Sequence, residues 1–218
     1  MPQECPRALP AGLYAITPEN LIGEALVEAT AAVIRGGARV VQYRAKQGSR
    51  DQKRLDAQAV VDCCRAAGAC SIVNDCVELA VQVGADGVHL GEHDGAIAAA
   101  RALLGPDKII GVSCYDRWEN AAAALSSGAD YIAFGAFFPS RSKQTDRRAS
   151  LDLLRHAASL GHRAVAIGGI RIDNAPPLVA AGAHCLAVID AVWNADDRQA
   201  AARAFAALFT GTTDSLSH

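Results

Sequence analysis

The chain has 218 residues, of which 51% are hydrophobic and 20% are charged, and its formal net charge is −2. These proportions are typical of a folded globular protein and exclude a disordered one. The near balance of charges gives no reason to expect nucleic acid or an anionic membrane as a partner. No apolar stretch approaches the roughly 18 residues that a membrane-spanning helix needs.

Short apolar segments alternate with Ala-rich segments along the chain. The apolar segments predict strands that are covered on both faces: Leu13–Thr17, Ala38–Arg44, Cys70–Asp75, Gly87–Leu90, Ile109–Cys114, Tyr131–Phe138, Ala164–Gly169 and Cys185–Val192. The segments between and after them predict helices: Glu24–Arg35, Asp51–Ala67, Val77–Val83, Ala96–Leu104, Arg117–Ser126, Leu151–Leu160, Ala175–Ala181 and Asp197–Phe209.

These alternating units favour an α/β fold, a closed (β/α)8 TIM barrel, because the predicted strand ends recur about every 25 residues. Repeated Gly-Ala steps at 84–85, 128–129 and 182–183 mark turns from a helix into the next strand. An open doubly wound sheet is the competing fold, but no Gly-x-Gly-x-x-Gly follows a strand. We expect 1–218 to form a single barrel domain, with a core at about 13–209 and a frayed tail at 211–218.

The seven cysteines form no Cys-x-x-Cys pair, and Cys63 and Cys64 are adjacent. This pattern suits neither a zinc site nor a disulfide framework. We expect reduced thiols, mostly buried as small hydrophobic side chains. The stretch 1–7 has no apolar signal segment, so we expect a cytoplasmic protein.

In a barrel of this kind, catalytic groups belong at the C-terminal ends of the strands. Arg44 and Lys46 are two residues apart on an extended segment and therefore point the same way. Adjacent cations favour a phosphate or pyrophosphate between them, and Lys143 would add a third positive charge. The alternative is an exposed basic strand end.

Asp75 and Asp94 come from neighbouring loops, and two carboxylates with phosphate oxygens and waters are how Mg²⁺ is usually held. The alternative for Asp75 is a helix cap, because the sequence from Asp75 to Glu78 has the capping-box pattern. His89 and His93 lie on a strand and a loop without a third soft ligand. We therefore interpret them as packed or solvated histidines rather than zinc ligands.

Gly168 and Gly169 stand where such barrels bind phosphate through backbone N–H groups. A glycine turn needed only for chain reversal is the alternative. The stretch Pro139–Ser150 is a 12-residue polar loop with several basic residues. We favour a lid that closes over anionic substrates over a merely solvated loop.

Eight segments, in this order, resemble the thiamine-phosphate synthase (thiamine phosphate pyrophosphorylase) family: Leu13–Thr17, Gln42–Lys46, Val73–Asp75, Gly84–Asp94, Gly111–Ser113, Phe134–Lys143, Ala166–Ile170 and Ala187–Ile189. The resemblance runs from about Leu13 to Phe209. It implies a (β/α)8 enzyme that joins 4-amino-5-hydroxymethyl-2-methylpyrimidine diphosphate to 4-methyl-5-(2-phosphoethyl)thiazole. Thiamine phosphate and pyrophosphate are then the products.

The resemblance also implies roles for individual residues. Those that would hold the pyrimidine diphosphate are Gln42, Arg44, Lys46, Asn74, Ser113 and Lys143, of which Arg44, Lys46, Ser113 and Lys143 form the catalytic set. Those that would contact the thiazole phosphate are Ser140, Arg141, Ser142, Gly169, Ile189 and Asp190. Asp75 and Asp94 would bind one Mg²⁺ per subunit. The expected partners are small phosphorylated molecules, and a homo-oligomer is left open.

Some positions depart from the family pattern. Asp190 stands where serine is usual, and a carboxylate beside a phosphate is repulsive. Ala45 replaces the usual acid between Arg44 and Lys46. The first alternative function is the related thiazole tautomerase, which typically has a histidine where Tyr115 stands and lacks the Asn-Asp and metal-aspartate positions. The second is a non-catalytic phosphate-metabolite binder, and the third is an unrelated phosphate-binding barrel such as an epimerase.

Overall fold

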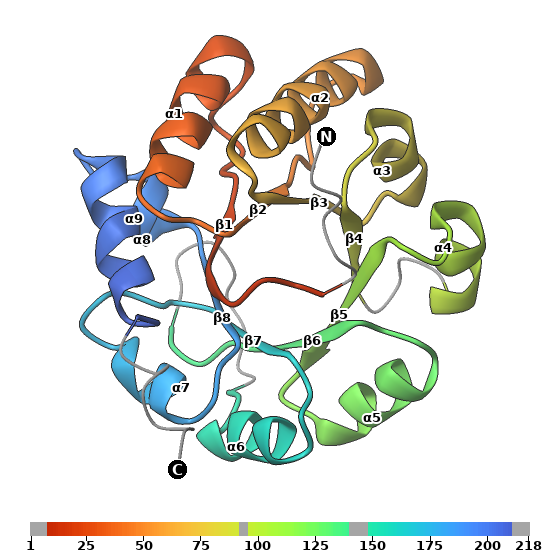
Figure 1. Cartoon of the computed structure of the whole chain (residues 1–218), viewed down its shortest axis with the longest axis vertical. Coiled ribbons are helices and arrows are strands. Elements are labelled where there is room, and N and C mark those ends of the chain that lie inside the picture. Colours follow the sequence, from red (N-terminus) through yellow and green to blue (C-terminus); the bar gives the residue numbers. More distant parts are fainter. Residues whose placement is uncertain (1–7, 92–95, 140–147, 211–218) are drawn as a thin grey trace.

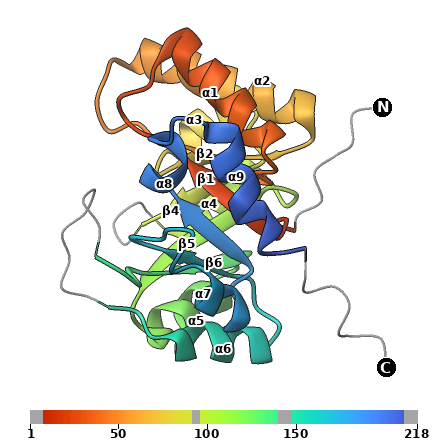
Figure 2. The ribbon, with the colours of Figure 1, turned by 90° about the vertical axis from the view of Figure 1, so that its left-hand side faces the viewer.

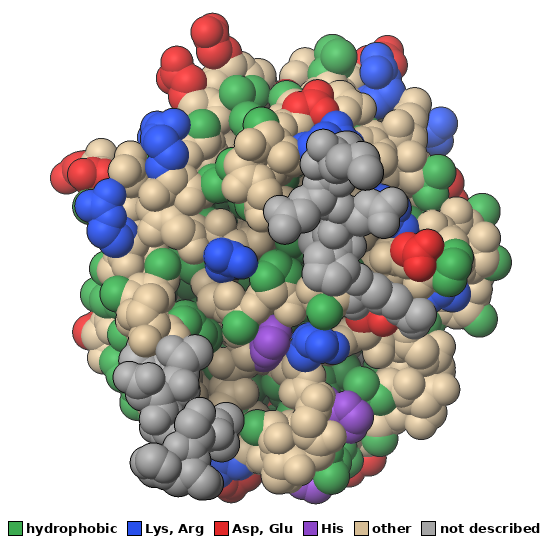
Figure 3. All heavy atoms as spheres, viewed as in Figure 1, with side chains coloured by type: hydrophobic (Ala, Val, Ile, Leu, Met, Phe, Trp, Pro, Cys, Tyr) green, Lys and Arg blue, Asp and Glu red, His purple; other side chains and the backbone are tan. Residues whose placement is uncertain are grey.

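The computed structural model describes residues 8–91, 96–139 and 148–210. Within these residues, no helix is both long enough and apolar enough to cross a membrane. On the face shown in Figure 3, the described Lys, Arg, Asp and Glu side chains are scattered rather than gathered in a patch of one sign. This distribution agrees with the near-zero net charge.

Eight parallel strands form a closed barrel in which neighbours in sequence are neighbours in space (Figure 1). The strands are β1 (Gly12–Ile16), β2 (Val40–Tyr43), β3 (Cys70–Asn74), β4 (Gly87–Leu90), β5 (Ile109–Tyr115), β6 (Tyr131–Phe134), β7 (Ala164–Ile167) and β8 (Cys185–Val188). The barrel closes between β1 and β8, where Gly12 lies opposite Cys185 and Ala15 lies opposite Val188. The predicted (β/α)8 fold is confirmed.

The helices surround the barrel, as the side view in Figure 2 also shows. They are α1 (Gly23–Arg35), α2 (Arg50–Ala67), α3 (Val77–Val83), α4 (Ile97–Leu104), α5 (Trp118–Ser126), α6 (Leu151–Ser159), α7 (Pro176–Ala180), α8 (Asp190–Trp193) and α9 (Arg198–Ala207). The first seven connect successive strands, whereas α8 and α9 follow the last strand.

The strands bury both of their faces, which explains their continuously apolar sequences. Side chains that alternate along the strands form an inner core: Tyr14, Ile16, Val40, Ile72, Tyr131 and Val165. Their neighbours along the chain pack outward against the helices, for example Leu13, Val41 and Val73. The inner core fills the barrel. Polar side chains that point into the barrel therefore reach solvent only at its two ends.

Local signals set the helix boundaries. Ser49 begins α2 by accepting a hydrogen bond from the backbone N–H of Gln52 at 3.2 Å. Gly84, the first residue of a Gly-Ala step, ends α3 with φ +64°. This left-handed conformation favours glycine because a Cβ atom would be strained there. The chain then turns directly into β4.

Most of the strands end one or two residues from the predicted position, and two of them end four residues early. The predicted strand 131–138 stops at Phe134, although the Phe137 N–H still donates to the carbonyl of Ile167 at 3.2 Å. The predicted strand 185–192 stops at Val188, and Asp190–Trp193 form α8 instead. A buried apolar run looks the same in a strand and in a buried helical turn, so periodicity could not separate them. The predicted frayed tail at 211–218 lies outside the described residues.

Candidate active site at the mouth of the barrel

Polar side chains project inward where β3, β4 and β5 approach their C-terminal ends. Asn74 lies opposite His89 in the register of β3 and β4, and His89 Nε2 lies 2.9 Å from Ser113 Oγ on β5. Gln42 on the adjacent β2 is only 2% exposed. The structure therefore brings Asn74 and Ser113, both predicted site residues, to the two sides of one histidine.

His89 belongs to a buried network of hydrogen bonds inside the barrel. Its Nδ1 lies 2.9 Å from the hydroxyl of Tyr131, which lies 2.9 Å from the hydroxyl of Tyr14. We call these three residues and Ser113 the inner network. The sequence predicts only a packed or solvated role for His89, because nothing in it indicates that residues 42 and 117 positions apart would meet.

Arg44 lies just beyond the end of β2, where its side chain is 26% exposed. Its Nη1 donates to Glu19 Oε1 at 2.8 Å, and its backbone N–H donates to Thr17 Oγ1 at 2.9 Å. The guanidinium is thus held by the loop that follows β1. Lys46 is exposed in the next loop, and its carbonyl accepts from Lys53 Nζ at 3.0 Å.

Glu19 is a residue of this mouth that was not predicted from the sequence. The sequence did hold one indication of its role. Glu19 lies two residues after the predicted end of the first strand, and polar residues at such ends line the mouth of a barrel. The pairing with Arg44 matters because a carboxylate and a phosphate would compete for the same guanidinium.

Asp75 occupies a conformation that is unusual for its residue type. Its φ is +63°, and its backbone N–H donates to the carbonyl of His89 at 2.8 Å. The capping-box interpretation is wrong by one position, because α3 begins after Cys76 and has no side-chain cap. A left-handed non-glycine residue costs on the order of 1 kcal/mol and persists where the surroundings enforce it, often at functional sites. Asp94, its predicted metal-binding partner, lies outside the described residues.

Gly168 and Gly169 have φ values of +102° and +62°. A Cβ at Gly168 would overlap Ala136, and one at Gly169 would overlap the carbonyl of Pro139. The close approach of the segment after β6 therefore requires glycine at both positions. Their presence is thus explained by packing, and it does not by itself identify a phosphate site.

After the neighbouring strand β8, Ile189 joins that strand to α8, and Asp190 is the first residue of the helix. The Asp190 carboxylate accepts a hydrogen bond from Asn194 Nδ2 on the same segment at 3.4 Å. The carboxylate that departs from the family pattern is therefore engaged by the residue that follows its own helix.

The loop predicted to be a lid is described only at its two ends. The N–H of Ala149 donates to the carbonyl of Ala136 at 3.0 Å, which holds those ends together. Ser150 then caps α6 by accepting from the N–H of Asp152 at 3.2 Å. The predicted site residues Ser140, Arg141, Ser142 and Lys143 lie outside the described residues.

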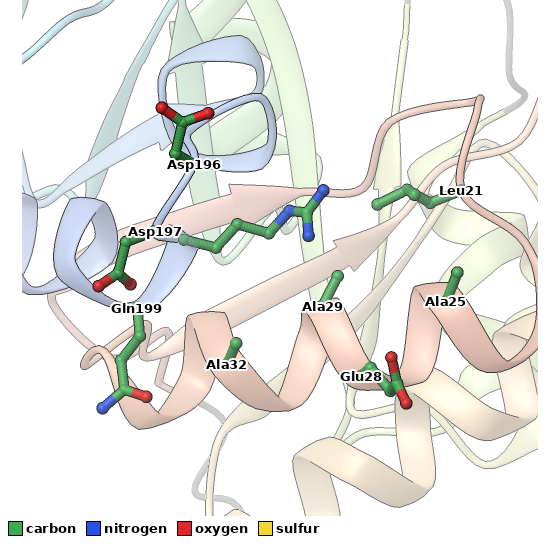
Figure 4. Close-up of a pocket in the computed structure, with 9 residues that line it drawn as sticks. Leu21, Ala25, Glu28, Ala29, Ala32, Asp196, Asp197 and Gln199 are labelled. Atoms are coloured by element: carbon green, nitrogen blue, oxygen red, sulfur yellow. The ribbon is translucent and has the colours of Figure 1, made fainter.

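A groove of about 570 Å³ lies outside the barrel between α1 and α9 (Figure 4). None of the predicted site residues that the structure describes lines it, and its charged lining residues are three acids, Glu28, Asp196 and Asp197, and one arginine, Arg198. Carboxylates repel phosphate groups. Three acids outweigh one arginine there, so the groove is less suited to phosphorylated ligands than the mouth of the barrel.

Known proteins resemble this chain over nearly its whole length. The family model described as thiamine monophosphate synthase matches residues 13–192. The curated thiamine-phosphate synthase of Chromobacterium violaceum is 54% identical over 198 residues, which is 91% of this chain and 96% of that protein. The one from Methylobacillus flagellatus is 52% identical over 91% of this chain and 95% of that protein.

A solved structure gives the same result in three dimensions. Thiamine phosphate pyrophosphorylase from Pyrococcus furiosus superposes with a TM-score of 0.81 and 35% identity, covering 91% of this chain and 95% of that one. Sequence and structure thus agree over nearly the whole barrel. The chain belongs to the thiamine monophosphate synthase family.

Proposed function

We propose that this protein is a thiamine-phosphate synthase, a transferase that moves a pyrimidinylmethyl group from its diphosphate to a thiazole phosphate. The observation that carries the proposal is the 54% identity to a curated synthase over 91% of the chain. The mouth of the barrel supports it with a half-buried arginine and inward-facing polar side chains at adjacent strand ends.

The pyrimidine diphosphate would lie across the ends of β2 to β5. Arg44, Lys46 and Lys143 supply positive charge for the diphosphate, with Ser113 as a hydrogen-bond donor. Gln42 and Asn74 supply amide groups for the remaining polar contacts. Arg44 shares its guanidinium with Glu19 before the substrate binds.

Bond cleavage in this proposal needs charge stabilisation rather than proton transfer. The bond between the pyrimidine methylene carbon and the diphosphate oxygen breaks, and both electrons leave with the diphosphate. The thiazole nitrogen then donates its lone pair to the methylene carbon. The three basic side chains oppose the negative charge that grows on the departing oxygen, which lowers the barrier.

Mg²⁺ fits the residues in this proposal. Asp75 and Asp94 would hold one ion per subunit, since Asp75 directly follows the C-terminal end of β3, at the mouth of the barrel. When bound, Mg²⁺ supplies further neutralisation of the leaving diphosphate.

The thiazole phosphate would lie on the opposite side of the mouth. Ser140, Arg141 and Ser142 supply hydroxyls and a cation, while Gly169, Ile189 and Asp190 line the ends of β7 and β8. The contact of the Asp190 side chain with Asn194 leaves its backbone as the group that would face the phosphate. We also propose that the enzyme works in the cytoplasm on small phosphorylated molecules.

The test mixes both substrates with Mg²⁺ and measures pyrophosphate release and thiamine phosphate formation. We expect both products in equal amounts, and neither when the thiazole phosphate is withheld. A tautomerase or a simple binder would release no pyrophosphate, and this result would overturn the proposal.

The variant Arg44→Ala should raise the KM for the pyrimidine diphosphate more than the KM for the thiazole phosphate. Arg155→Ala changes an exposed arginine on α6 and should alter neither KM.

The metal assignment has its own test. Asp75→Ala or Asp94→Ala should lower turnover by about 100-fold and raise the Mg²⁺ concentration needed for half-maximal rate. Asp107→Ala, at an exposed site between α4 and β5, serves as the control. Rates like those of the wild type at low Mg²⁺ in either active-site variant would remove the assignment.

A further inference from the structure

The inner network contains residues for which the proposed reaction gives no role. Only Ser113 is assigned to the substrate, yet its Oγ is the last atom of a series that continues through His89 and Tyr131 to Tyr14, with three successive separations of 2.9 Å. These residues come from four different strands, β5, β4, β6 and β1. A buried polar series of this kind is costly unless each member is satisfied by the next.

The barrel packs tightly around these side chains. The ring of Tyr131 stacks on His89 with centroids 5.6 Å apart and meets Tyr14 edge-on at 6.2 Å. A Cβ at Gly111 would overlap the Tyr131 ring, so the absence of a side chain there makes room for it. The rings are therefore fixed in position, and only their hydroxyl and imidazole protons can rearrange.

With a neutral imidazole at His89, the three hydrogen bonds of the inner network have two consistent arrangements. Burial raises the pKa of both Tyr14 and Tyr131 well above 10.0, so each phenol keeps one proton to donate. In the first arrangement, Tyr14 donates to Tyr131, Tyr131 donates to His89 Nδ1, and His89 Nε2–H donates to Ser113 Oγ. In the second, every hydrogen bond runs in the opposite direction, and Ser113 donates to His89.

The two arrangements differ in what the Ser113 hydroxyl offers to a ligand at the mouth of the barrel. In the first, the hydroxyl proton of Ser113 is available to a ligand. In the second, only its lone pairs are, and these would repel an anion. A diphosphate offers only acceptor oxygens when it is ionised, and its negative charge grows as it departs. The first arrangement is therefore the one that suits the leaving group.

We propose that His89 is a positioning residue that, supported by Tyr131 and Tyr14, commits the Ser113 hydroxyl to donate to the departing diphosphate. This inference rests on the proposed function. His89 acts through Ser113 and exchanges no proton with the substrate. The hydrogen bond from Ser113 to the diphosphate strengthens as negative charge grows toward the transition state. Loss of His89 should therefore lower kcat more than it raises KM.

The first experiment compares variants in steady-state pyrophosphate release. His89→Leu should lower kcat about tenfold or more with little change in KM for the thiazole phosphate, and His89→Gln, which keeps an N–H donor, should recover part of the loss. Tyr131→Phe should give a smaller loss of about threefold to tenfold. Tyr43→Phe removes a phenol that packs outside the barrel and should leave kcat unchanged.

A double-mutant cycle separates positioning from a general structural defect. In a Ser113→Ala background, His89→Leu should cause no further loss, because its target is already gone. If the double variant instead loses activity by the product of the two single losses, the proposal is overturned. Equal rates for Tyr131→Phe and Tyr43→Phe would overturn it as well. Circular dichroism establishes that each variant is folded. If His89→Leu does not fold, Tyr131→Phe takes its place in the cycle with Ser113→Ala, and the same two outcomes test the proposal.

A spectroscopic readout does not depend on turnover. Nitrogen-15 NMR of the imidazole should show His89 protonated on Nε2 when inorganic pyrophosphate is bound, and Tyr131→Phe should weaken that preference. Protonation on Nδ1 in the complex would contradict the proposal even if the enzyme is active. Failure of the wild-type enzyme to release pyrophosphate would instead contradict the proposed function.

Discussion

Glu19 is the counter-ion of the arginine that we expect to bind the diphosphate. Its Oε1 lies 2.8 Å from Arg44 Nη1, at a site where both side chains are partly exposed. An ion pair of this kind contributes little to stability, on the order of 0–1 kcal/mol. Its effect should therefore appear in substrate affinity, where carboxylate and diphosphate compete.

Glu19→Gln should lower the Kd for inorganic pyrophosphate by about twofold to fivefold, because the guanidinium no longer has to leave a carboxylate. Isothermal titration calorimetry at fixed Mg²⁺ measures the change. Glu119→Gln is the matched control, since Glu119 pairs with Arg117 at an exposed site. Weaker pyrophosphate binding by Glu19→Gln would show that Glu19 orients Arg44 instead of competing for it.

His184 gives the fold a pH dependence that is independent of the active site. Burial lowers the pKa of its imidazole below 6.5, and Arg163 lowers it further, although the hydrogen bond from Nε2 to the carbonyl of Leu9 raises it. The unfolded chain therefore takes up the proton more readily than the folded one. The corresponding stability is complete above pH 6.5 and is lost as the pH falls toward the folded-state pKa.

Urea unfolding at about pH 8 and about pH 5.5 should therefore show lower stability in acid, and His184→Gln should reduce this difference. A pH profile unchanged by the substitution would remove His184 as a cause. NMR titration of the imidazole would report its pKa directly.

At the scale of elements, neighbouring strand–helix units are tied at the N-terminal ends of the strands. Asp130, just before β6, accepts from the backbone N–H of Ile110 on β5 at 2.8 Å and from Arg101 Nη2 on α4 at 2.6 Å. Arg101 also donates to the carbonyls of Gly105 and Lys108. One carboxylate thus joins three successive pieces of the barrel.

Asp130→Ala should lower the free energy of unfolding by about 1–3 kcal/mol, because it leaves a buried N–H and a partly buried guanidinium without this acceptor. Catalytic rates should be unchanged, since the site lies at the other end of the strands. Asp62→Ala removes an exposed pair with Arg65 and should cost only a few tenths of a kcal/mol. A matching small loss for Asp130→Ala in urea unfolding would show that the tie contributes little.

Most elements could be predicted because their signals are local. Apolar runs such as 109–114 indicate buried strands, and glycines such as Gly68 and Gly84 end helices where their left-handed φ is needed. The predictions were wrong where one apolar run spans two elements, as at β8 and α8. The spacing of apolar residues does not show that the strand ends and the helix begins around Ile189.

The candidate site shows the same division between local and non-local information. Barrel geometry predicts that Asn74 and Ser113 reach the mouth, because each lies near the C-terminal end of a strand. The partners of these residues depend on strand register and side-chain packing. For this reason neither the pairing of Glu19 with Arg44 nor the contact of His89 with Ser113 could be inferred from spacing alone.

At the scale of the whole molecule, the two tryptophans report on different parts of the barrel. Trp118 on α5 contacts His156 at 4.3 Å and Phe134 at 6.4 Å between ring centroids, whereas Trp193 on α8 is 1% exposed. If the barrel is one cooperative unit, both environments are lost together. Trp118→Phe and Trp193→Phe variants should therefore give fluorescence transitions that coincide with circular dichroism in urea. Separate midpoints would show that the two halves unfold independently.

The pairing of β1 with β8 has a consequence for the way the protein is made. The first strand, Gly12–Ile16, has one neighbour about 25 residues ahead, but its other neighbour is Cys185–Val188. A ribosome producing about 5–20 residues per second needs on the order of 10–30 s to supply that last strand. During this interval the nascent chain carries an open sheet edge, and such edges invite pairing with other chains. The hazard ends only when Cys185–Val188 has been made and pairs with the first strand.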